Sequence, residues 1–102
     1  MDATLDICGH FYQIKLVDDL KTEDGKQKAW GRLNNNLQII ELEKDVSVSR
    51  LSEALLHEIL HAIDCSIDCG LNEQRVQILA NCLCQLGVGE HLVGKLDLVT
   101  NR

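Results

Sequence analysis

The 102-residue chain contains no proline and no low-complexity tract, so nothing in it resembles a linker or a disordered segment apart from the last few residues. Basic residues are few, because ten Lys and Arg stand against 16 Asp and Glu and the formal net charge is −6. Without a basic stripe to neutralise phosphates, nucleic-acid binding is disfavoured. No apolar run approaches the ~20 residues of a membrane span, so we expect no membrane partner either.

The sequence also shows no pattern of an export signal, since residues 1–6 contain no positively charged region followed by an apolar stretch. We therefore expect a cytoplasmic protein. The odd number of cysteines then predicts reduced thiols, mostly small core residues, rather than a disulfide framework. With 45% hydrophobic and 25% charged residues and no internal repeat, residues 1–102 are expected to form one globular domain, and the oligomeric state is left open.

Strand patterns occupy residues 11–42. In Phe11–Val17, apolar and polar residues alternate with the period of a half-buried strand. A charged loop, residues 18–28, leads to two short apolar runs, residues 29–33 and 37–42, separated by three asparagines that tolerate positive φ. These runs are expected to pair as a hairpin, and the second run is apolar on both sides. The prediction is a small, mostly antiparallel three-stranded sheet.

From residue 49 the period changes to that of a helix. The apolar face of the first helix, residues 49–67, is broad, and Gly70 is placed to end it in a left-handed conformation. A second helix, residues 72–86, begins at Asn72 as N-cap, with Leu71 and Val76 as a hydrophobic staple. Its expected apolar face is Val76, Leu79, Ala80, Leu83 and Leu86. The tail, residues 89–102, is poorly determined, and the strands and helices together predict an α+β domain.

The chemistry is concentrated at His57-Glu58-Ile59-Leu60-His61, on the polar face of the first helix. Histidines four residues apart stand one above the other, so both imidazoles can bind one zinc ion. Glu58 lies beside the first histidine, where it can reach the attacking water and act as general base. The alternative is that a polar helix face carries these residues by chance and binds no metal.

A catalytic zinc site needs a third protein ligand. Glu73 begins the second helix in phase with buried Val76 and Ala80, and this placement makes it the first choice. The helix dipole alone would also favour a carboxylate there. Cys69, in the turn, and His91, after the second helix, remain alternatives. We expect one Zn²⁺ per chain.

The segments Leu55–Ile63, Gly70–Val76 and Leu79–Asn81 resemble the small phage and mobile-element metallopeptidases related to the ImmA/IrrE and minimal gluzincin families. The resemblance covers residues 9–86. It implies a minimal zincin-like fold in which a three-stranded sheet precedes the active-site helix and a following glutamate helix supplies the third ligand. By position, His57, His61 and Glu73 would be the ligands and Glu58 the base. One departure is Gln77, where related chains often carry a second acid.

Metal-assisted hydrolysis of a peptide bond is the mechanism that this grouping implies. Candidates for supporting the ligands or the transition state are Asp64, Gln77, Tyr12, His10 and His91. Asp64 would either orient a ligating imidazole or be a solvated surface acid. The resemblance and the two-sided apolar pattern suggest that the run from Leu37 to Leu42 forms the sheet edge beside the cleft, where a substrate peptide could add as a strand.

Two functions from different classes follow. The first is a zinc metalloendopeptidase with a narrow protein substrate, such as a repressor or a neighbour encoded on the same mobile element. The second is an inactive module in which zinc only pins two helices together for protein interaction. The apolar residues of the tail predict that residues 89–102 either cover the metal, which would make the protein latent, or pack elsewhere as structure.

Overall fold

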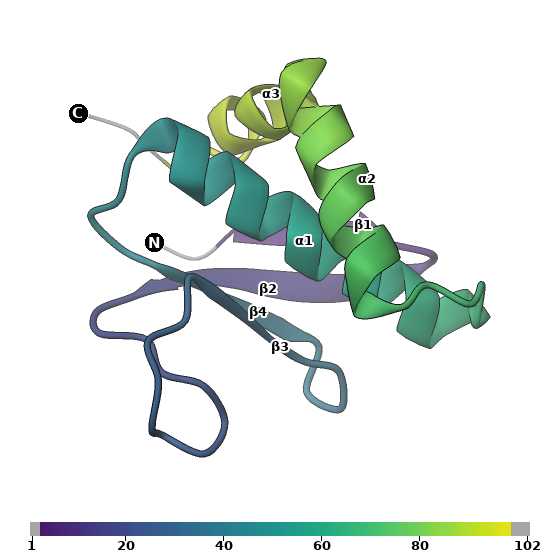
Figure 1. Cartoon of the computed structure of the whole chain (residues 1–102), viewed down its shortest axis with the longest axis horizontal. Helices are drawn as coiled ribbons and strands as arrows, with labels where there is room; N and C mark the ends of the chain where they lie inside the picture. The colour runs from purple at the N-terminus through teal and green to yellow at the C-terminus, as the bar shows by residue number, and fades with distance from the viewer. Residues whose placement is uncertain (1–2, 99–102) are drawn as a thin grey trace.

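The computed structural model describes residues 3–98, which form four strands and three helices (Figure 1). The strands are β1 (Ala3–Ile7), β2 (His10–Val17), β3 (Gly31–Asn34) and β4 (Ile39–Glu43). The helices are α1 (Val48–Ile67), α2 (Glu73–Gln85) and α3 (Val88–Lys95). The predicted α+β class is therefore confirmed. No helix among the described residues is long and apolar enough to cross a membrane.

The sheet is four-stranded and mixed, with the order β1-β2-β4-β3, so the prediction of three mostly antiparallel strands is wrong in detail. β1 and β2 pair antiparallel, as do β3 and β4, but β2 and β4 run parallel. The parallel pair arises because the chain leaves β2 and forms β3 at the edge of the sheet. It then returns as β4, which lies between β2 and β3. The predicted hairpin of β3 and β4 is confirmed, with Leu33 opposite Ile40.

The strand absent from the prediction is β1, which forms a tight hairpin with β2. Its residues alternate as Ala3, Leu5 and Ile7 against Thr4 and Asp6, so the period of 2 is present in the sequence. The hairpin turn has positive φ at both Cys8 (53°) and Gly9 (87°). A cysteine rarely takes this conformation, which is why the turn is not evident from the sequence.

β4 lies inside the sheet and not at its edge, which corrects the expectation for Leu37–Leu42. Ile40 and Leu42 are completely buried, whereas Leu37 precedes the strand and is exposed. Ile40 and Leu42 share the face that packs in the core, whereas Ile39 and Glu41, on the opposite face, are only half-buried, so only one face of this strand is fully covered. Positive φ in the β3–β4 turn falls at Gln38 and not at the asparagines. The edge strand is β3.

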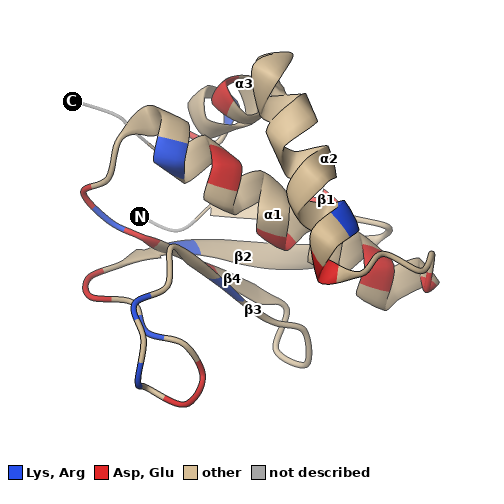
Figure 2. Ribbon diagram, in the orientation of Figure 1, with Lys and Arg blue, Asp and Glu red and all other residues tan. Residues whose placement is uncertain are grey.

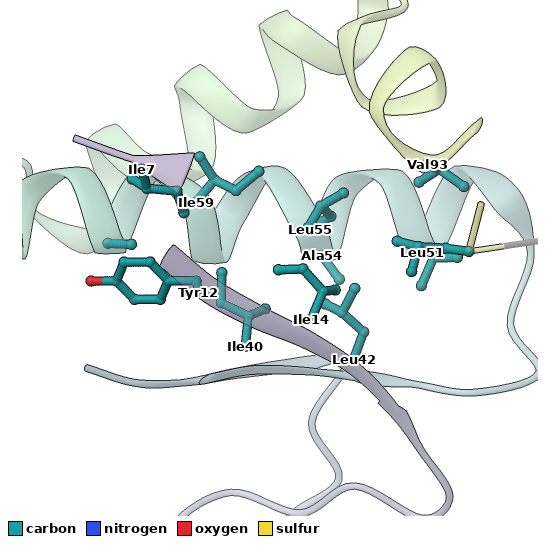
Figure 3. Close-up of a cluster of buried hydrophobic side chains, with 12 residues drawn as sticks. Ile7, Tyr12, Ile14, Ile40, Leu42, Leu51, Ala54, Leu55, Ile59 and Val93 are labelled. Atoms are coloured by element: carbon teal, nitrogen blue, oxygen red, sulfur yellow. The ribbon is translucent and has the colours of Figure 1, made fainter. Parts of the chain in front are cut away.

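The core lies between the sheet and α1 (Figure 3). Tyr12, Ile14, Ile40 and Leu42 project from the strands toward Leu55 and its neighbours on the helix. On its other side α1 contacts α2 and α3, and Leu56 and Leu60 pack there against Val76 and Ala80. The helix is thus buried on two sides, so Glu58, which the sequence predicts on the polar face, is buried, as is Ala54. Ile67, the last residue of α1, is exposed.

The end of α1 differs from expectation, whereas the start of α2 agrees with it. Asp68, and not Gly70, is the left-handed C-cap of α1, although Gly70 also has positive φ. Asn72 caps α2 as predicted, because its side chain accepts a hydrogen bond from the Arg75 N–H. Leu79 and Leu86 were expected on the apolar face of α2, but both are exposed because α1 covers only a narrow strip.

The described part of the tail forms α3 and packs on α1. Gly89 is buried against Ser52 and Leu56, and Val93 and Leu98 belong to the main core. This placement favours the structural alternative for residues 89–98. Residues 99–102, to which the expectation of an inhibitory tail also extends, lie outside the described residues.

The cysteines are free, but the expectation of core positions is wrong. Four are exposed and Cys84 is half-buried. Small volume alone therefore does not place a cysteine in a core, since the four exposed cysteines fall in turns or on the outer faces of α1 and α2, and Cys84 only packs at the margin of the cluster between these helices.

A buried carboxylate, that of Glu43, organises the long loop between β2 and β3. It accepts hydrogen bonds from the N–H groups of Asp19 (3.1 Å) and Leu20 (2.9 Å) and pairs with the Lys28 ammonium at 2.8 Å. The Lys28 hydrogen bond holds the pKa of Glu43 below its usual value of 4.5. Glu43 thereby fixes the segment that leads into β3.

The lowered pKa of Glu43 makes stability depend on pH. A carboxyl that is more acidic in the folded state stabilises the fold above its unfolded pKa, and this stabilisation is lost as the pH falls toward the folded pKa. Glu43→Gln should lower the free energy of unfolding by about 1–2 kcal/mol at pH 7, because the buried Leu20 N–H and the partly buried Asp19 N–H lose a charged acceptor while Lys28 is half-exposed. Urea unfolding from pH 7 to pH 2 should show this difference shrinking below pH 4.5. An equal difference at every pH would contradict the assignment.

Candidate metal centre

Two histidines on α1 face the start of α2. His57 and His61 are one helical turn apart, and their Nε2 atoms lie 3.2 Å from each other. Both side chains are partly exposed, at 19% and 29%, so they line an accessible surface and do not sit in the core. The position of α1 is fixed by its own buried residues Leu56, Ile59 and Leu60, which lie next to the histidines in the sequence.

Glu73 is the first residue of α2 and meets both imidazoles. One carboxylate oxygen lies 2.7 Å from Nε2 of His57 and the other lies 2.9 Å from Nε2 of His61. Figure 2 shows this acidic start of α2 beside α1. His57, His61 and Glu73 form a group whose donor atoms all lie within 4.8 Å of one another and could hold a metal ion.

The donor chemistry of this group fits zinc. Tetrahedral zinc with bonds of 2.0–2.1 Å separates its ligand atoms by about 3.3 Å, close to the 3.2 Å between the two Nε2 atoms. Without a cation, each Nε2–H can donate to a different Glu73 oxygen, but the 3.2 Å contact between the two Nε2 atoms is then a contact between two donors. A cation receives electron pairs from all three residues at once. The set therefore suits a metal better than a simple ion pair.

Glu58 is buried beside this cluster, with 8% of its surface exposed. Burial raises the pKa of Glu58 to about 7 from an ordinary value of 4.5, and the nearby Glu73 carboxylate adds to the shift. A group with a pKa near the working pH can both accept and return a proton. This carboxyl is suited to acid–base chemistry.

Edge strand β3 passes directly over Glu58. A Cβ added to Gly31 would lie 3.0 Å from Cγ and 3.1 Å from Oε2 of Glu58, so a larger residue would push the Glu58 side chain aside by a few tenths of an ångström. Two cavities open here. One, of about 210 Å³, and another, of about 390 Å³, both include Gly31, His57 and Glu58 in their walls.

The two cavities share His57 and Glu58 in their walls and differ in their other lining residues. The smaller one extends toward Trp30, Ala54 and Gln77, and the larger one toward the potential ligands His61 and Glu73.

The other predicted site residues are not part of the cluster. Tyr12 is buried in the core, where its hydroxyl donates to Asn35 Oδ1 at 2.7 Å. His91 is exposed on α3, and His10 contacts Gln38. Cys69 is exposed in the turn after α1, and neither Cys69 nor His91 belongs to the donor group.

Two polar candidates have other partners. Gln77 lines the smaller cavity and donates to Glu53 (3.2 Å) and Asn81 (3.1 Å). Asp64 accepts hydrogen bonds from the turn after α1, from Leu71 N–H and the Cys69 thiol. The recorded bonds of Asp64 thus go to the turn, and not to a ligating imidazole as the first of its two expected roles requires.

Three residues beside the site were not predicted. Gly31 and Trp30 lie on or next to β3, and Arg50 lies at the start of α1 with its guanidinium 4.7 Å from the centre of the Trp30 ring. The single tryptophan next to a glycine, in a chain with one Phe and one Tyr, is the signal that could have pointed to them. Their meeting depends on the return of β4 inside the sheet, which no local pattern reveals.

Comparisons with known proteins add no relative. No protein-family model matches the chain, and searches among curated proteins and solved structures find no significant match. The resemblance to small metallopeptidases therefore stays a prediction that rests on the motif and on the geometry of the site.

The convergence of three donors predicts one metal ion per chain. Zinc titration of the wild type should saturate at one equivalent, because no second group of the described residues offers three clustered donors. His57→Ala and Glu73→Ala should each weaken zinc binding by at least ten-fold, since each removes one of three ligands. Lys95→Ala replaces an exposed residue at the end of α3. This variant is the control and should bind zinc with the affinity of the wild type. Unchanged binding by Glu73→Ala would remove Glu73 from the ligand set.

Proposed function

We propose that this protein is a zinc-dependent metallopeptidase of minimal zincin-like architecture. The observation that supports this most directly is the position of Glu58, a buried carboxyl with a pKa of about 7 next to a His57–His61–Glu73 donor set. A structural zinc site is normally closed by four protein ligands, whereas this group offers three. Three ligands and an adjacent base are the parts of a catalytic site.

In this proposal the residues of the chain have separate tasks. His57, His61 and Glu73 hold the metal, and zinc when bound supplies a Lewis acid that polarises the scissile carbonyl and acidifies the attacking water. Glu58 takes a proton from that water and passes it to the leaving amine. The burial of Glu58 supports this cycle, because a carboxyl with an ordinary pKa would be a poor donor to the amine at neutral pH.

The substrate is proposed to be an extended peptide. Edge strands present unpaired backbone groups to which another strand can add. β3 is such an edge, and its first residue, Gly31, lies against Glu58. A peptide added along β3 would pass the base and the two cavities, so β3 takes the role that the sequence assigned to residues 37–42.

Glu58→Gln separates metal binding from hydrolysis. The variant should bind one zinc as the wild type does, because Glu58 is not a ligand, and should lose peptide cleavage by several orders of magnitude because the base is gone. Its melting temperature at pH 8 should not fall, since a neutral amide replaces a charge whose burial is unfavourable above pH 4.5. Assays of a peptide library with zinc-loaded protein measure this. Undiminished cleavage would exclude Glu58 as the base, and zinc binding without cleavage by the wild type would favour the inactive interaction module.

Gly31→Ala tests the close approach of β3. The added methyl must displace the Glu58 side chain, so zinc affinity should stay within about two-fold while kcat falls at least ten-fold. Gly25→Ala is a matched control for glycine replacement, because nothing lies within 4 Å of a Cβ built there, although its positive φ costs some stability. Equal kcat for Gly31→Ala and the wild type would show that β3 does not constrain the base.

A further inference from the structure

The turn between α1 and α2 determines where the third ligand of the proposed metal site lies. Residues 68–72 connect the helices, and the chain reverses there through two left-handed residues, Asp68 (φ 49°) and Gly70 (φ 76°). A glycine and an exposed aspartate allow many turn conformations. Something must therefore select the one that brings Glu73 to the histidines.

Asp64, on the last full turn of α1, holds this segment. Its carboxylate oxygen Oδ1 accepts hydrogen bonds from the Leu71 N–H (3.0 Å) and the Cys69 thiol (3.6 Å), while its backbone carbonyl accepts from the Asp68 N–H (2.7 Å). The hydrogen bonds to the carboxylate, the one from the Leu71 N–H above all, lower the pKa of the Asp64 carboxyl below its usual value. The turn is thus fastened at its far end to α1.

From the other side, the turn is held by α2. Arg75 donates to the Gly70 carbonyl at 3.3 Å, and the Asn72 side chain accepts from the Arg75 N–H at 2.8 Å. Leu71 is consequently fixed between the two helices, and Glu73 follows two residues later. Asp64 lies three residues after His61 on the same rigid helix, so its bond to Leu71 sets the distance between that helix and Glu73.

We propose that Asp64 is a positioning residue for Glu73: it holds the α1–α2 turn so that the carboxylate of Glu73 meets both histidines. The inference rests on the proposed metal site but not on peptide hydrolysis. The side-chain hydrogen bonds of Asp64 go to the turn and not to either histidine ligand, so Asp64 acts through Leu71. An acid that merely stabilised the end of α1 would change the melting temperature without a specific effect on the metal.

The test measures zinc affinity by competition with a chromophoric chelator in the full chain. Asp64→Ala removes the acceptor and should weaken zinc binding 10–100-fold, the range typical of residues that orient metal ligands. Asp64→Asn retains one neutral acceptor and should lose less. Asp68→Asn removes the same charge four residues away without touching the Leu71 bond, and should bind within two-fold of the wild type. Circular dichroism at the assay temperature verifies that each variant is folded, and Asp64→Asn provides the comparison should Asp64→Ala unfold.

A second arm shows whether the effect passes through Glu73. In a Glu73→Ala background, adding Asp64→Ala should cause no further loss of zinc affinity, because the ligand that it positions is gone. Wild-type affinity in both folded Asp64 variants would overturn the proposal, as would an equal further loss in the Glu73→Ala background. A wild type that binds zinc but cleaves no peptide contradicts only the peptidase proposal, whereas a wild type that binds no zinc overturns both.

Discussion

Burial of α1 on two sides is the constraint on which the rest of the molecule depends. One side packs on the sheet through Leu55 and Ile59, and the other packs against α2 and α3 through Leu56 and Leu60. At about 1.5–3 kcal/mol for each fully buried leucine or isoleucine, these contacts exceed any single polar interaction in the chain. They leave one strip of the helix open, and His57 and His61 lie on that strip. The packing of the core therefore determines the direction in which the two histidines point.

The same packing creates the unusual environment of Glu58. The residue lies at the border between the open strip and the face covered by the sheet, beneath Gly31 of β3. A carboxyl in this place costs free energy when ionised, which a protein selected only for stability would avoid. Such a group next to convergent metal donors is typical of functional sites. The unfavourable burial of a charged Glu58 and its proposed role as general base thus concern the same side chain.

The elements that could be predicted from sequence were those with a strong local signal. The periodicity of α1, the N-cap Asn72 and the β3–β4 hairpin are all encoded within a few residues, and the approach of Glu73 to His57 follows from helix phase. What could not be predicted depends on contacts between distant segments. The positive φ of Cys8 conceals the β1–β2 hairpin, and the insertion of β4 next to β2 follows no rule of spacing. For the same reason Gly31 and Trp30 were missed, since their value to the site comes from which strand is at the edge.

The central claim is that His57, His61 and Glu73 hold a catalytic zinc, and zinc X-ray absorption spectroscopy of the loaded wild-type protein tests it most directly. The account predicts a first shell of nitrogen and oxygen only, at about 2.0–2.2 Å, with scattering from two imidazoles. At least one oxygen in that shell should belong to water. The spectrum of zinc-loaded Glu73→Ala should therefore still contain an oxygen ligand. A sulfur ligand at about 2.3 Å, or a shell closed by four protein ligands, would contradict the claim and identify a structural site.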